Sequence, residues 1–248
     1  MLIPIVMATV SAFTLSTDVS LKLYYSFYQD LEEDAFGISV RFCMNQLVFG
    51  YQYTFPCIVS LLVGVFYYEF SELVRQLHAN LPTEPKSLSQ REILPLAQLH
   101  TLLFKISHDL AEATSLIAFL LVSSQMTVMY CTLAYFMLTS DGPPSLPQIC
   151  ESLVIVALGP LSVISISLCS SRINTQRQKM QKTVVLLKGK LIRQKNCDRE
   201  VLQCLSMMQE ERLQTMSAAG IGELNAGFIL AMFGSLLTYG LLILNLKK

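Results

Sequence analysis

Residues 224–246 read LNAGFILAMFGSLLTYGLLILNL, a stretch of 23 residues without one charged side chain. Three other long stretches, 42–68, 113–140 and 152–171, are also uncharged and run to 27, 28 and 20 residues. A helix needs roughly 17–25 apolar residues to cross a bilayer. A buried helix of a soluble protein would instead show a polar face every few residues. We therefore predict membrane-spanning helices over 42–68, 113–138, 152–171 and 224–246.

A fifth apolar stretch, residues 1–17, is also uncharged but only marginally long enough to span a bilayer. Its rival interpretation is a signal peptide, which usually has a basic region before its apolar run, and no Lys or Arg precedes this one. We predict a spanning helix here too. The expected fold is an all-α, polytopic membrane protein with five spans, four of them in the membrane region 1–171.

Basic residues alternate between the loops that join these segments. Loop 69–112 holds four Lys or Arg and loop 172–223 holds ten, whereas 141–151 holds none. Cytoplasmic loops carry the excess of Lys and Arg in membrane proteins. This pattern predicts that 69–112 and 172–223 are cytoplasmic and that the carboxyl end of the chain lies outside.

Loop 172–223 differs from the others because its residues 172–215 contain no proline and a single glycine, Gly189. Its apolar residues recur at near-helical spacing, at Val201, Leu202, Leu205, Met208 and Leu213. We predict an extension of the fourth span below the membrane, a second helix over 197–215, and a turn at 217–220. The apolar stripe packs either against its own loop or against other subunits. Pro56 and Gly159-Pro160 are expected to kink the second and fourth spans.

The last span combines a mainly apolar helix with a narrow face of smaller and more polar residues. Ala231, Ser235, Thr238, Leu242 and Asn245 follow at spacings of four, three, four and three, which places them on one face. Such a face meets either a neighbouring helix through small-residue packing or water. Asn245 is the residue most expected to face water.

Several functions are disfavoured by what the spans lack. They contain no Asp, Glu or His, and His78, His100 and His108 are not spaced as metal ligands. We therefore expect no enzymatic activity, no cofactor and no metal site. The basic residues come without interleaved aromatics and adjoin a membrane, so no nucleic-acid partner is expected. Internal repeats and mid-membrane charges, which are typical of secondary transporters, are not seen in the sequence.

The segment Ala219-Gly-Ile-Gly-Glu-Leu-Asn225, followed by Thr238-Tyr239, five mostly apolar residues and Asn245-Leu246, carries a family resemblance. It resembles the carboxyl-terminal signature of the arthropod gustatory receptor family, in which Gln-Phe usually stands where Asn245-Leu246 stand here. The positions that match the motif are Gly220, Leu224, Asn225, Thr238 and Tyr239. Ile221 and Gly222 replace bulky aromatics.

This resemblance implies a taste receptor of the plasma membrane that acts as a ligand-gated, non-selective cation channel. It implies seven spans, of which the five here would be the last, and a tetramer of identical or different subunits. The cytoplasmic region 172–223 would anchor subunits to one another, and helix 224–246 would line the pore. The pore-lining residues would be Ser235, Thr238, Leu242, Asn245 and Leu246. The alternatives are a membrane transporter or a truncated, non-functional receptor fragment.

A small-molecule tastant is the ligand that the resemblance implies, bound among the outer halves of the spans before the pore helix. Polar and aromatic residues there, beside Arg41, suit a sugar or a bitter compound, although aromatics also gather at membrane interfaces. The candidate ligand-binding residues are Asn45, Gln46, Tyr51, Gln52, Gln125, Tyr130 and Tyr135.

Overall fold

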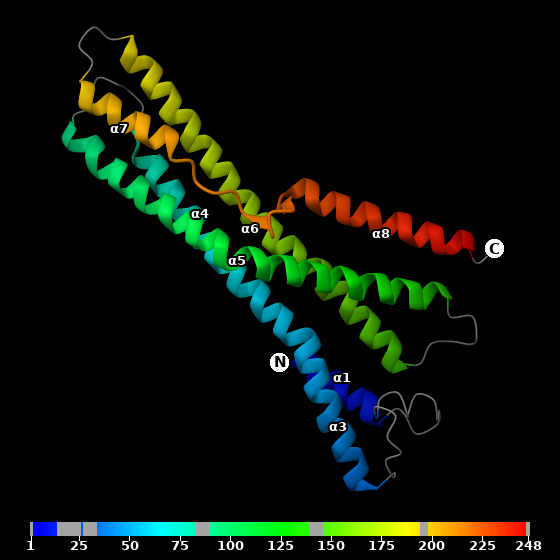
Figure 1. Cartoon of the computed structure of the whole chain (residues 1–248). Helices are drawn as coiled ribbons and strands as arrows, with labels where there is room; N and C mark the ends of the chain where they lie inside the picture. The colour runs from blue at the N-terminus through cyan, green and yellow to red at the C-terminus, as the bar shows by residue number, and fades with distance from the viewer. Residues whose placement is uncertain are drawn as a thin grey trace. The chain divides into compact units, whose positions relative to one another are not determined.

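The computed structural model describes residues 2–13, 26, 34–82, 90–138, 146–193 and 198–246 of the chain. Within these ranges the protein is mainly α-helical, with a π-helical segment, one short two-stranded ribbon and an irregular stretch at 211–216 (Figure 1). The helices are α1 (Leu2–Phe13), α3 (Ala35–Phe49), α4 (Phe55–Asn80), α5 (Gln90–Leu138), α6 (Leu146–Ile192), α7 (Arg199–Glu210) and α8 (Ala226–Leu246). The π-helical segment covers Gly50–Thr54, and the antiparallel ribbon pairs β1 (Ser217–Ala218) with β2 (Gly222–Glu223).

Four helical segments are long and apolar enough to cross a membrane: Ala35–Asn80, Arg91–Met137, Pro147–Ile192 and Ala226–Asn245. This confirms the all-α class and four of the five predicted spans. By helix length and hydropathy the chain is a multi-pass membrane protein. The fifth prediction stays a prediction. Helix α1 has 12 residues and is about 18 Å long at 1.5 Å per residue, and residues 1 and 14–17 of the predicted span lie outside the described ranges.

The long helices continue far past the uncharged stretches that predicted them. Helix α5 has 49 residues and begins at Gln90, so most of the described part of the predicted loop 69–112 is helical. Helix α6 has 47 residues and ends at Ile192. A helix that leaves the membrane needs no break when its charged side chains can face solvent. Helix α7 follows, where Asp198 Oδ1 accepts a hydrogen bond from Glu200 N at 3.2 Å.

The backbone departs from α-helical geometry just before Pro56. Helix α3 ends at Phe49, and in the π-helical segment the Phe55 N–H donates to the Gly50 carbonyl, five residues back. Proline has no N–H, and its ring collides with the carbonyl four residues earlier in a regular α-helix. The wider π turn accommodates this conflict without ending the helix. Helix α6, in contrast, runs through Pro160 as one helix.

The chain divides into two compact units, and the division cuts through α4, α5, α6 and α8. Unit 1 comprises 1–61, 121–164 and 231–248, and unit 2 comprises 62–120 and 165–230. The boundaries predicted from the sequence, at 171 and 223, separate membrane from cytoplasmic regions and stay a prediction. In unit 1, α1 packs along α3. The core of unit 2 is built from fully buried side chains of α4 to α7, including Tyr67, Leu77, Leu103, Ile173, Met180, Leu205 and Met208.

Candidate functional site

The family-motif residues that precede α8 shape the entry into that helix. Ala219 and Gly220 have φ values of 50° and 72°, and Ile221 N donates to the Ala218 carbonyl at 3.0 Å, which closes the β1–β2 turn. Leu224 is completely buried. Asn225 caps the helix, because its Oδ1 accepts a hydrogen bond from Phe228 N at 2.9 Å. The motif therefore supplies a turn, a core side chain and a helix cap.

One face of α8 packs within unit 1. Met232, Gly240 and Ile243 are buried on this face. A Cβ on Gly240 would lie 3.4 Å from Leu133 Cδ2, so the glycine lets α8 approach α5 closely. This face gives α8 its intramolecular support.

A second face of α8 is the small and polar stripe. Ala231, Ser235, Thr238, Leu242 and Asn245 are all exposed on it. The Ser235 hydroxyl donates to the Met232 carbonyl at 2.8 Å, and the Thr238 hydroxyl donates to the Gly234 carbonyl at 2.9 Å. Of the predicted pore-lining residues, the structure describes four side chains, and Leu246 is described only as the last residue of α8.

A third face of α8 carries large exposed apolar side chains, namely Leu230, Phe233, Leu237, Leu241 and Leu244. The three faces each occupy roughly a third of the helix circumference at 3.6 residues per turn. Helix α8 is also the least buried of the four long segments. Only 17% of its apolar window is buried in the chain, compared with 28% to 39% in the others. The side chains on its other two faces are largely exposed, although the stripe contacts α5 at Ser235.

An aromatic and hydroxyl contact joins α5 to α8 in unit 1. The Tyr130 hydroxyl lies 2.6 Å from Ser235 Oγ. Because Ser235 uses its one proton on the Met232 carbonyl, Tyr130 is the donor in this bond. The Tyr130 ring also meets the Tyr239 ring edge to face, with centroids 4.8 Å apart. The sequence placed Tyr130 among the ligand residues, and the structure places it against the predicted pore helix.

The other candidate ligand residues are spread over α3, the π-helical segment and α5. Tyr51 is 75% exposed and stacks on Phe55, and the exposed Tyr135 meets Phe136. Gln125 packs against Gly159, where its Oε1 lies 3.2 Å from an ideal Cβ position. No hydrogen bond in the described ranges joins the set Asn45, Gln46, Tyr51 and Gln52 to Gln125 or Tyr130. The structure therefore brings no single cluster together from this set.

Two of the buried polar side chains lie on α3. Arg41 and Asn45 are both almost completely buried, and Arg41 Nε donates to Ser26 Oγ at 2.9 Å. Arg41 Nη2, Asn45 Nδ2 and Gln46 Oε1 are buried without a hydrogen-bond partner in the described part of the chain. The sequence signal for this group was the presence of Arg, Asn and Gln next to an otherwise apolar segment.

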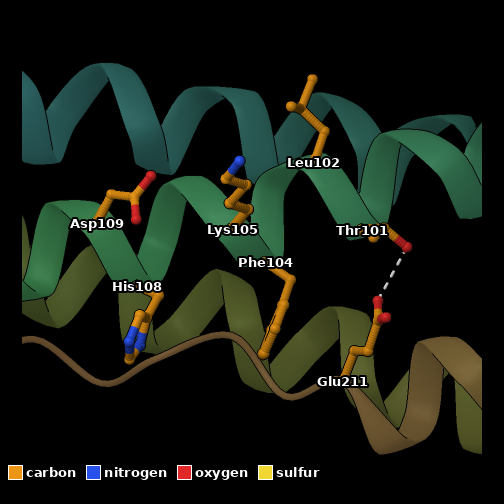
Figure 2. Close-up of a pocket in the computed structure, with 7 residues that line it drawn as sticks. All are labelled: Thr101, Leu102, Phe104, Lys105, His108, Asp109 and Glu211. Atoms are coloured by element: carbon orange, nitrogen blue, oxygen red, sulfur yellow. Dashed lines mark hydrogen bonds between the residues drawn. The ribbon is translucent and has the colours of Figure 1, made fainter.

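Unit 2 contains a cavity of about 630 Å³, which the sequence did not indicate. Figure 2 shows its lining side chains, Thr101, Leu102, Phe104, Lys105, His108 and Asp109 of α5, and Glu211 after α7. The Thr101 hydroxyl donates to Glu211 Oε2 at 2.9 Å. Next to this pair, His100 Nδ1 lies 3.7 Å from Glu211 Oε2, and burial lowers the pKa of His100 although Glu211 opposes the shift. All the residues that line this cavity lie outside the uncharged stretches of the sequence.

An ionic group lies just beyond the ends of two uncharged stretches in unit 2. Glu72 accepts hydrogen bonds from Arg75 and, at 3.5 Å, from Arg172. The hydrogen bonds from Arg75 lower the pKa of Glu72 to about 2. The Arg172 guanidinium also lies 4.5 Å from the centroid of the Tyr68 ring. Aromatic and basic side chains at this level are typical of a membrane interface.

Comparison with known proteins adds no assignment: no protein-family model matches the chain, and no curated protein matches it. Within the described residues, no group of three or more His, Cys, Asp or Glu side chains is arranged to hold a metal ion.

Proposed function

We propose that the chain is a subunit of a ligand-gated, non-selective cation channel of the gustatory receptor type, with α8 lining a pore shared between subunits. Residues 172–223 would be cytoplasmic and the carboxyl end extracellular, in a multi-pass protein of the plasma membrane. The ligand would be a small-molecule tastant. The sequence motif around α8 and the positive-inside pattern of the loops support this orientation.

The observation that carries the proposal is the exposed polar stripe on an otherwise apolar helix. Ser235 and Thr238 satisfy their hydroxyls on their own backbone, but Asn245 presents an exposed amide. A polar amide that faces hydrocarbon loses its hydrogen bonds to water. In a spanning helix such groups face water or another protein segment. A water-filled pore along this stripe meets that requirement.

The three faces of α8 suit a pore helix, because each would meet different surroundings. Its buried face packs within unit 1, its stripe would face the pore, and its large apolar face would meet lipid or the next subunit. Leu242 is 57% exposed and lies between Thr238 and Asn245 on the stripe. A ring of four such leucines beside a ring of asparagines would form an apolar gate next to a polar constriction.

Cysteine accessibility separates a pore from simple helix packing. In a background without native cysteines, Ser235→Cys, Thr238→Cys and Asn245→Cys would each be treated with a charged, membrane-impermeant thiol reagent. The thiolate is the reactive form and needs water. We expect these positions to react at least about tenfold faster than Leu237→Cys and Leu241→Cys, because a thiol in lipid ionises poorly. Cation current through the expressed protein should fall as the stripe positions react.

Two results would count against the channel. Equal reaction rates on both faces, or protection of the stripe positions, would indicate that this face is covered by protein or lipid. The mass of the purified chain in mild detergent, corrected for bound detergent, gives an independent check. A tetramer agrees with a shared pore, whereas a clean monomer contradicts a pore made by several copies of α8.

A further inference from the structure

Helices α4 and α6 lie side by side where their uncharged stretches end. Gly64 of α4 faces α6, because a Cβ placed there would lie 4.0 Å from Cys169 Sγ. About one turn further along each helix, the Arg172 guanidinium lies 4.5 Å from the centroid of the Tyr68 ring. Tyr68 ends one uncharged stretch, and Arg172 directly follows another. The uncharged stretches of the two helices therefore end at the same level.

Two guanidinium groups share one carboxylate at this level. Glu72 accepts hydrogen bonds from Arg75 Nη2 and, at 2.8 Å, from Arg75 Nε. Arg172 Nη2 reaches the same carboxylate at 3.5 Å, which is longer than a typical N–H···O hydrogen bond. Glu69 forms no ion pair with either arginine in the described part of the chain. The group of Glu72, Arg75 and Arg172 thus carries one net positive charge.

Both arginines of this group are open to the surroundings. The side chain of Arg75 is 52% exposed and that of Arg172 is 38% exposed. A ligand can therefore reach both guanidiniums from the surface, and it needs no enclosed cavity.

Exposed apolar side chains continue from this group into the uncharged stretches. On α4, Val65 and Tyr68 precede Glu72 at spacings of three and four residues, which places them on one face of the helix. Both are exposed. On α6, Leu168 lies about one turn before Arg172 and is exposed as well. The surface is therefore apolar where the helices would lie in the membrane and cationic where they would leave it.

We propose that this surface binds an anionic phospholipid, with its phosphate on Arg172 and Arg75 and an acyl chain along Val65 and Leu168. Guanidinium groups bind phosphate oxygens through paired N–H donors, and the exposed apolar side chains match the hydrocarbon. Phosphatidylcholine has the same phosphate but no net charge, so it compensates the positive charge of the group less well. The proposed orientation puts this site at the cytoplasmic leaflet, where anionic lipids are concentrated. The choice of leaflet rests on that orientation, whereas the binding itself does not.

Thermal unfolding of the purified full chain in nanodiscs tests the binding step. The discs contain phosphatidylcholine with a rising fraction of phosphatidylserine of the same acyl chains, and free O-phosphoserine serves as the soluble headgroup. A ligand that binds only the folded state raises the unfolding midpoint with its concentration. We expect this response to phosphatidylserine and not to O-phosphoserine.

Two matched variants show whether the response depends on this site. Arg172→Gln should raise the phosphatidylserine fraction needed for the same shift by at least about tenfold, because it removes hydrogen bonds to a charged group. Lys182→Gln removes an exposed charge ten residues further along α6, about 15 Å away, which exceeds the Debye length. It should leave that fraction nearly unchanged.

A third variant keeps the test decisive if Arg172→Gln does not fold. Glu72→Gln removes the carboxylate that competes with the lipid phosphate and leaves Arg75 and Arg172 without a counter-ion in this group. We expect a lower midpoint in pure phosphatidylcholine and a larger rise with phosphatidylserine than in the parent chain. A smaller rise in Glu72→Gln would overturn the proposal.

Three further outcomes would also overturn it. The first is an equal midpoint with and without phosphatidylserine. The second is an equal loss of the response in Arg172→Gln and Lys182→Gln, which would indicate general attraction of a basic chain to a charged bilayer. The third is the same response to O-phosphoserine, which would indicate a site for soluble anions. None of these measurements needs a current, so the lipid site and the channel can fail independently.

Discussion

Helices α6 and α8 both carry small polar side chains within a long uncharged stretch, but those of α6 are buried and those of α8 are exposed. In α6, Ser162, Ser167 and Ser170 are buried within the chain, whereas in α8, Ser235 and Thr238 are exposed. The buried share of the apolar window is 39% in α6 and 17% in α8. These serines of α6 are buried by other residues of the same chain. The hydroxyls of Ser235 and Thr238 in α8 bond to carbonyls of their own helix, and Ser235 also bonds to Tyr130 of α5, but both remain exposed.

The largest expected difference between the two helices comes from large-to-small substitutions. Ile173 of α6 is fully buried, so Ile173→Ala should lower the free energy of unfolding by about 2–5 kcal/mol. Leu241 of α8 is 62% exposed, so Leu241→Ala should change it by less than about 0.5 kcal/mol. Titration with a denaturing detergent in mixed micelles measures both. A comparable loss for Leu241→Ala would break the comparison and place that face of α8 against another subunit.

The pH dependence of stability extends the comparison to His100, which is buried. Burial lowers the pKa of His100 in the folded protein, so the unfolded state binds more protons as the pH falls. Its contribution to stability is present above about pH 6.5, the pKa expected in the unfolded chain, and is lost as the pH falls toward the folded value. The slope is at most about 1.4 kcal/mol per pH unit. Unfolding measured between pH 5 and 8 should be flatter in this window for His100→Gln, while the exposed His108→Gln serves as the control.

Serine-to-alanine substitutions should act with opposite signs in the two helices. The Ser167 hydroxyl of α6 is buried without a partner within the described ranges, so Ser167→Ala should be neutral or stabilising by up to about 1 kcal/mol. The Ser235 hydroxyl of α8 pairs with Tyr130, so Ser235→Ala should destabilise by about 0.5–1.5 kcal/mol. The same mixed-micelle titration resolves the sign. If both substitutions destabilised the protein equally, buried and exposed serines would not differ in the way described.

The sequence could predict the four long helices because their evidence is a simple count of uncharged residues. It could not predict which side of each helix is buried, since Ser167 and Ser235 occur in similar apolar surroundings and only their packing differs. Asn45 is buried while Tyr51 is exposed, and on a regular helix these two positions already lie about 120° apart.

Only part of the candidate site could be predicted from the sequence, again because packing decides which side chains are buried. The stripe on α8 was predictable because spacings of three and four residues define a face on any regular helix. Arg41 is buried and bonds to Ser26, 15 positions away. The Tyr130–Ser235 contact joins residues 105 positions apart, and hydropathy alone carries no information on such pairs.

The smallest expected effect concerns the turn that leads into α8. Ala219 adopts a φ of 50°, a conformation that costs a non-glycine residue roughly 1–2 kcal/mol. Ala219→Gly should remove this cost, against some gain in unfolded-chain entropy, and stabilise the protein by about 0.5–1 kcal/mol. The hydrogen bond from Ala219 N to the Ser115 carbonyl, at 3.1 Å, does not involve the side chain and should persist.

Gly220 provides the matched reverse experiment for this turn. Its φ is 72°, and a Cβ placed there would meet nothing within 4 Å. Gly220→Ala should therefore destabilise through backbone strain alone, by about 1 kcal/mol. Opposite signs for the two variants would show that the turn is held in its left-handed conformation in the folded protein. If Ala219→Gly lost stability as well, Ala219 would not be strained in this turn. The orientation in which α8 begins would then have to be fixed by the Asn225 cap instead.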